Sequence, residues 1–126
     1  MKNKISDIQL AGFQSDVELY LKRNKNLLDS VSKHQSASSR VSRAIIKAAT
    51  QCGCITIEGK PQENKDEPTA MIHGTLCKNC RKAIEKEMGD ELFYIAALCS
   101  SLDLSLFDVI VEERERLELL GQFSLK

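Results

Sequence analysis

Two close pairs of cysteines constrain the fold of this 126-residue chain more than any other feature. The pairs are Cys52-Gly53-Cys54 and Cys77-Lys78-Asn79-Cys80, and 22 residues separate them. Each pair can present two sulfurs to one point, and four thiolates complete the tetrahedral coordination of a zinc ion. We therefore predict one zinc site formed by the sulfurs of Cys52, Cys54, Cys77 and Cys80.

The cysteine pattern leaves other uses of these sulfurs open. An iron–sulfur cluster takes the same ligands, a reversible dithiol switch uses the same spacing, and the two pairs need not share a site. His73 lies four residues before Cys77 and is an alternative ligand. We favour four sulfurs and zinc, in a site that is structural because no coordination position stays open for a substrate. The fifth cysteine, Cys99, falls on an apolar helical stripe and is predicted to be a small buried hydrophobe.

Composition indicates a soluble globular protein that is most simply one domain, 1–126, with 52–80 as a zinc-binding insertion. No apolar stretch approaches the roughly 20 residues that span a bilayer, and the N-terminus has no apolar signal segment, so we expect no membrane association and a cytoplasmic location. The net charge is zero, but residues 1–51 carry nine basic and four acidic side chains, and residues 52–126 carry nine and fourteen. This asymmetry predicts attraction between the halves, within one chain or across a dimer, or alternatively a basic face for nucleic acid.

Apolar periodicity predicts about four helices and places the cysteines between the second and the third. The helices are expected over about 16–31, with Ser15 as N-cap, over 39–50, from Cys77 or Cys80 to about Ser101, and from Ser105 to a left-handed cap at Gly121. Residues 34–39 are polar and small and are predicted to form a turn. Residues 55–57 and 71–73 are predicted to form a short ribbon, and 60–68 an exposed loop. The fold class is therefore all-α, with a small metal-tied loop or ribbon.

The segment from Glu87 to Leu98, E-M-G-D-E-L-F-Y-I-A-A-L, followed by Leu102-Asp103-Leu104-Ser105-Leu106, resembles the MazG-like all-α nucleoside triphosphate pyrophosphohydrolases. The resemblance covers about residues 84–118 and implies a helical bundle that forms dimers or tetramers. In active members, acidic residues from two helices bind Mg²⁺, which positions a nucleoside triphosphate for attack by water. By match, Glu87 and Asp90 fall on the second metal-binding pair, and Glu91 is adjacent.

The chain departs from that family on the preceding helix, where active members carry an E-E-x-x-E motif. Residues 39–50 hold no acidic side chain and instead present Arg40, Arg43 and Lys47. Two carboxylates do not neutralise Mg²⁺ and a triphosphate as four do, so any Mg²⁺ site at Glu87, Asp90 and Glu91 is expected to be vestigial.

Three functions follow from these observations. The first is a non-catalytic, zinc-stabilised MazG-like protein that acts through protein association, in a regulatory role, as a homodimer or with another protein. The second is a Mg²⁺-dependent nucleoside triphosphate pyrophosphohydrolase whose site is incomplete or shared between subunits. The third is a nucleic-acid-binding regulator. We favour the first and therefore assign no catalytic residue.

Overall fold

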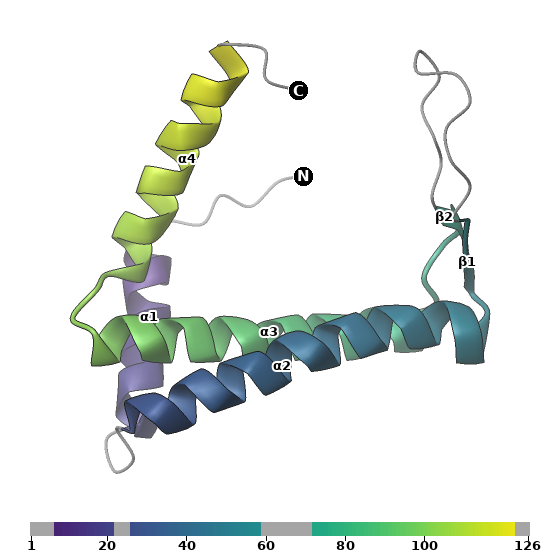
Figure 1. The fold of residues 1–126 in the computed structure, drawn as a ribbon, viewed down its shortest axis with the longest axis horizontal. Helices are drawn as coiled ribbons and strands as arrows, with labels where there is room; N and C mark the ends of the chain where they lie inside the picture. Colours follow the sequence, from purple (N-terminus) through teal and green to yellow (C-terminus); the bar gives the residue numbers. More distant parts are fainter. Residues whose placement is uncertain (1–6, 22–25, 59–71, 123–126) are drawn as a thin grey trace. The chain divides into compact units, whose positions relative to one another are not determined.

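The computed structural model describes residues 7–21, 26–58 and 72–122, which form four α-helices and one two-stranded sheet (Figure 1). In chain order the elements are α1 (Asp7–Leu21), α2 (Leu27–Lys47), a π-helical turn η1 (Ala48–Cys52), β1 (Ile55–Ile57), β2 (Ile72–Gly74), α3 (Lys78–Ser101) and α4 (Leu106–Gln122). The mostly helical class and the small ribbon between the second and third helices are thereby confirmed. The chain divides into two compact units. The first combines the segment up to His34 with the segment from Leu92 onward, and the second is Gln35–Glu91.

The unit that contains α1 and α4 is held by an apolar core. Its fully buried members are Val17 of α1, Ala96, Ala97 and Cys99 of α3, and Leu106 of α4, with partly buried apolar residues around them. Phe13, Val17 and Leu21 recur every four residues and so lie on one face of α1. Cys99 is 5 % exposed, which confirms it as a small buried hydrophobe, and burial raises the pKa of its thiol.

The turn between α3 and α4 is fixed by its own backbone and by one side chain from α1. Asp103 adopts a left-handed conformation (φ 57°), and the Leu104 N–H donates to the Cys99 carbonyl at 2.7 Å, as in a helix-ending Schellman motif. The amide of Gln14 donates to the Leu104 carbonyl and accepts from the Leu106 N–H, both at 2.8 Å. Gln14 thus satisfies backbone groups that would otherwise lack partners at the two helix ends.

The second unit contains the later part of α2, η1, the ribbon and the first part of α3. Strands β1 and β2 pair antiparallel with Ile55 opposite Gly74, Thr56 opposite His73 and Ile57 opposite Ile72. The predicted ribbon is therefore confirmed for residues 55–57 and 72–73, while Met71 and the predicted loop at 60–68 lie outside the described residues.

Helix boundaries in the first third of the chain differ from the predicted ones. Helix α1 already begins at Asp7, so Ser15 lies inside it and is not an N-cap. Helix α2 begins after Asn26, whose side-chain oxygen accepts from the Asp29 N–H at 3.1 Å, and it continues through the predicted turn at 34–39. The prediction of a turn at 34–39 was wrong because the small polar residues of this segment are compatible with a continuous helix.

Two contacts show how α2 accommodates that segment. The Ser36 hydroxyl accepts from the Arg40 guanidinium one turn later at 3.0 Å, and Ala37 is fully buried.

At the other end of the chain, Gly121 lies within α4 and has no left-handed backbone, so the predicted cap there is also wrong. By contrast, Ser105 caps α4 as predicted, because its hydroxyl accepts from the Asp108 N–H at 3.3 Å.

No single helix in the described part of the chain is long and apolar enough to cross a membrane; α3 and α4 meet the length and composition criteria only when taken together, as a pair bent by 107°.

Candidate metal centre

The four predicted cysteines come together in the second unit. One ligand atom from each of Cys52, Cys54, Cys77 and Cys80 lies within 4.8 Å of the others, and none of these cysteines is in a disulfide. The Cys52 and Cys77 sulfurs are 3.8 Å apart. Four sulfurs held at about 2.3 Å from a central ion in a tetrahedron are about 3.8 Å from one another. The cluster therefore has the spacing needed to hold a metal ion such as zinc.

The first pair is delivered by the end of α2. There the helix widens into η1, and the Gly53 N–H donates to the Ala48 carbonyl, five residues earlier, at 2.9 Å. Gly53 ends the turn with a left-handed backbone (φ 81°), which glycine adopts without the steric cost that a side chain would add. The chain consequently reverses between the two cysteines, and Cys54 can lie near Cys52.

The ribbon then brings the second pair to the first. Gly74, opposite Ile55 in the ribbon, also has a left-handed backbone (φ 92°), and a Cβ at this position would lie 2.6 Å from the Cys54 carbonyl oxygen. This close approach of two backbones requires glycine. Ile55 is buried at the same place and anchors the ribbon. Gly74 was not singled out in the sequence, although its position three residues before Cys77 is a signal that could have been used.

The second pair lies at the start of α3. Cys77 precedes the first residue of the helix, and its sulfur accepts from the Cys80 backbone N–H at 3.4 Å, as the oxygen of an N-cap residue does. This backbone hydrogen bond, with the Cys80 side chain, lowers the pKa of the Cys77 thiol to about 7. The bond between the same two side chains raises the pKa of Cys80 to about 12. One sulfur of the cluster is thus partly ionised near neutral pH, and the thiolate is the form that binds metal.

His73 lies apart from the sulfur cluster. Its Nε2 is 3.4 Å from a carboxylate oxygen of Glu58, on the exposed part of the ribbon. Among the described residues, the cysteines are the one group of three or more histidine, cysteine or acidic side chains close enough to hold an ion. The structure thus brings together the four sulfurs favoured in the sequence and leaves the alternative ligand outside.

The predicted acidic residues of α3 lie beside basic side chains. Glu87 accepts from Arg40 Nε at 3.3 Å, and the Arg40 guanidinium is 3.9 Å from Asp90, which also pairs with Lys86 at 3.1 Å. Glu91 is the next residue of α3 and is half-buried. A guanidinium group therefore lies beside the two carboxylates that the sequence resemblance marked as a Mg²⁺-binding pair. The sequence identified Arg40 as basic but could not show that it reaches across to α3.

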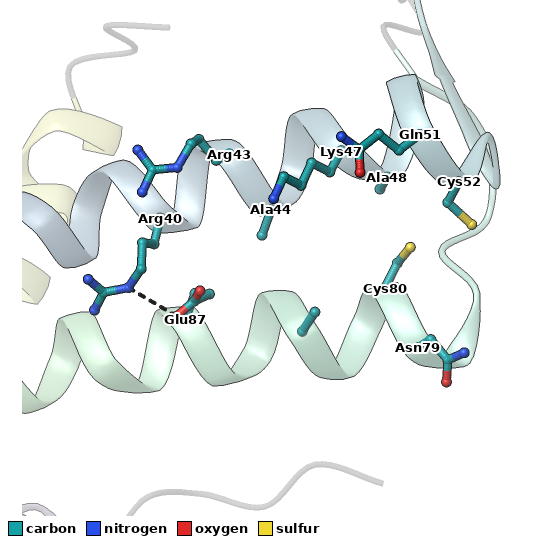
Figure 2. A pocket seen from close by; sticks show the side chains of 11 residues that line it. Arg40, Arg43, Ala44, Lys47, Ala48, Gln51, Cys52, Asn79, Cys80 and Glu87 are labelled. Atoms are coloured by element: carbon teal, nitrogen blue, oxygen red, sulfur yellow. Dashed lines mark hydrogen bonds and ion pairs between the residues drawn. The ribbon is translucent and has the colours of Figure 1, made fainter.

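A groove of about 410 Å³ runs between α2 and α3 and reaches the sulfur cluster (Figure 2). Figure 2 shows Arg40, Arg43 and Lys47 following one another along α2, while Glu87 and Cys80 lie on α3. The remaining lining is small or polar and comes from Ala44, Ala48, Gln51, Cys52, Asn79 and Ala83. The groove is therefore lined by alanines and bordered by the basic side chains of α2.

Comparison with known proteins gives no relative: no family model, no curated protein and no solved structure matches this chain.

Proposed function

We propose that this chain is a zinc-stabilised, non-catalytic helical protein of MazG-like type that acts by associating with a second copy of itself. The observation that carries the proposal is the closed cluster of four cysteine sulfurs. Four protein ligands complete the tetrahedral coordination of a zinc ion and leave no coordination position for a substrate or water, as in structural zinc sites. The zinc would fix the end of α2, the ribbon and the start of α3 to one another.

The arrangement around Glu87 supports the non-catalytic part of the proposal. Phosphoryl chemistry on a triphosphate needs metal ions held by several carboxylates. Here the guanidinium of Arg40 approaches both Glu87 and Asp90, and it neutralises charge that a Mg²⁺ ion would require. A cation beside these carboxylates disfavours Mg²⁺ binding. This supports the proposal that the chain is an inactive relative of such hydrolases.

Exposed apolar side chains support association. In the unit with α1 and α4, Tyr20 and Leu28 are 82 % and 79 % exposed, and Leu117, Leu119 and Leu120 near the end of α4 are also exposed. Single exposed apolar residues are ordinary, but several large ones gathered near a helix end are typical of surfaces that a partner covers. Since bundles of this kind bury such faces in symmetric pairs, a homodimer is the simplest partner arrangement.

Two measurements on the same purified, zinc-loaded chain test the proposal. Sedimentation analysis should give a homodimer, and incubation with Mg²⁺ and each common nucleoside triphosphate should release no pyrophosphate. Mg²⁺-dependent pyrophosphate release that is lost in Glu87→Gln but retained in Glu85→Gln would contradict it and favour the hydrolase. A chain that is monomeric at all accessible concentrations would equally overturn the association.

A further inference from the structure

The groove between α2 and α3 carries two cations that the rest of the described chain leaves without partners. Arg43 and Lys47 lie one helical turn apart on its rim and form no hydrogen bond or ion pair within residues 7–21, 26–58 and 72–122. Arg40, one turn earlier, differs because it is bound to Glu87. The groove thus presents a row of positive charge whose last two members have no partner among the residues that the structure describes.

The exposure of the lining indicates an elongated partner and not a small enclosed ligand. Arg43, Lys47, Gln51 and Asn79 are all exposed. Sites for small molecules bury most of the ligand surface, and these side chains could not do so. A shallow channel lined by alanines is instead suited to the face of a helix, as in complexes where an amphipathic helix lies in a groove.

Helix α4 carries the complementary row of charge. Asp108, Glu112 and Glu115 recur at four- and three-residue steps and therefore share one face of the helix. Their side chains are exposed and make no ion pair within the described residues, whereas Glu113 on another face is paired with Arg116. Leu119, one turn beyond Glu115 on the same face, is exposed and apolar.

We propose that α4 of a second copy docks antiparallel to α2 along this groove. The basic row has steps of three and four residues, Arg40 to Arg43 to Lys47, and the acidic row read backward has the same steps, Glu115 to Glu112 to Asp108. At 1.5 Å of rise per residue both rows span about 10 Å, so Glu112 faces Arg43 and Asp108 faces Lys47. This rests on the homodimer of the proposed function and names its contact surface.

The contact is self-complementary. In a dimer with two-fold symmetry, α4 of each copy occupies the groove of the other, so every charge pair occurs twice. The uneven charge of the two halves of the chain then becomes an attraction between copies. Association should accordingly weaken as salt concentration rises, because these rim charges are exposed and screened.

Charge reversal with complementation tests the surface. The variant Arg43→Glu/Lys47→Glu and the variant Asp108→Lys/Glu112→Lys should each raise the homodimer Kd about tenfold or more, because like charges then face each other across both contacts. An equimolar mixture of the two variants should form a heterodimer of near wild-type Kd, since every reversed pair again has opposite signs. The control Arg81→Glu/Lys82→Glu makes the same change in net charge outside the groove and should leave the Kd unchanged. Sedimentation equilibrium measures all four samples, and circular dichroism checks that each is folded.

The outcomes separate the surface from the association itself. A wild-type dimer whose Kd is unchanged by either reversal overturns the docking surface while the homodimer stands; a wild-type monomer overturns both. Failure of the mixed sample to recover, with both variants folded, also overturns the pairing. Salt-sensitive retention of an oligonucleotide that is lost only in Arg43→Glu/Lys47→Glu, with dimerisation unaffected, would assign the groove to nucleic acid instead.

Discussion

Cys99 and the four clustered cysteines show how one residue type is used differently in the two units of this protein. Cys99 is buried among Val17, Ala96, Ala97 and Leu106, where its thiol acts as a small apolar group and its pKa is raised by burial. Cys52, Cys54, Cys77 and Cys80 are exposed or half-buried and gather their sulfurs within 4.8 Å. The first unit is stabilised by apolar burial, whereas the cysteine end of the second buries few large side chains and instead gathers four sulfurs that could hold a metal ion.

Among the variants, we expect the largest difference between the two units when one cysteine of the sulfur cluster is replaced. Cys80→Ser is expected to abolish stoichiometric zinc binding and lower the free energy of unfolding by about 3 kcal/mol or more, which corresponds to roughly 10 °C in melting temperature. Cys99→Ala should leave the zinc content unchanged and cost only about 1 kcal/mol of packing. Elemental analysis and thermal unfolding of both variants measure this contrast, and zinc loss from Cys99→Ala would show that the ligand set is wrong.

Glycine substitutions test the backbone that brings the two pairs of cysteines together. Gly74→Ala places a Cβ 2.6 Å from the Cys54 carbonyl oxygen, in a left-handed conformation, and should cost about 3 kcal/mol and weaken zinc binding. The matched variant Gly53→Ala has the same left-handed strain but open space around its Cβ, and should cost about 1 kcal/mol. Denaturant unfolding and zinc titration of the pair give the comparison; equal effects would mean that the close approach at Gly74 does not matter.

A core substitution should act on the other unit alone. Val17 is 1 % exposed, and Val17→Ala removes buried carbon from the contact with α3 and α4, at a cost of about 2 kcal/mol. Because no sulfur ligand belongs to that core, zinc affinity should not change. Amide hydrogen exchange should show faster opening of α1 and α4 while residues 52–57 and 72–80 keep their protection, and loss of protection throughout would show that the two units unfold as one.

The smallest expected effect is a change in proton release on zinc binding. Zinc requires thiolates, so binding displaces protons and its apparent affinity falls as the pH is lowered. The pKa of Cys77 lies at about 7, below its ordinary value of 9.0, so this thiol is largely protonated at pH 6 and largely ionised at pH 8. The number of protons released per zinc should therefore fall by about one across that range. Titration calorimetry in buffers of different ionisation enthalpy measures this number, and a proton count that is the same at pH 6 and pH 8 would contradict the lowered pKa of Cys77.

The sequence predicted the class of the fold and the four sulfurs because both depend on local pattern. Helical periodicity located α3 and α4 closely, and the cap at Ser105 followed from a residue type at a fixed offset. The turn expected at 34–39 failed because small polar residues are compatible with a helix when their hydroxyls bond within it and when Ala37 is buried by tertiary packing.

Contacts between distant residues could not be predicted in the same way. The pairing of Arg40 with Glu87 and the bonds of Gln14 across the α3–α4 turn join residues 47 and 86 or more positions apart. Nothing in the local pattern around these residues specifies the partner, because the geometry arises only when the helices pack. The need for glycine at position 74 arises likewise from a backbone that approaches it from residue 54.

X-ray absorption spectroscopy at the zinc edge, on the 126-residue chain purified under reducing conditions, tests the central claim most directly. The four-sulfur cluster predicts about one zinc per chain, with four sulfur neighbours at about 2.3 Å and no nitrogen or oxygen ligand. A shell that contains nitrogen or oxygen, or protein that contains no zinc and takes none up, would contradict it.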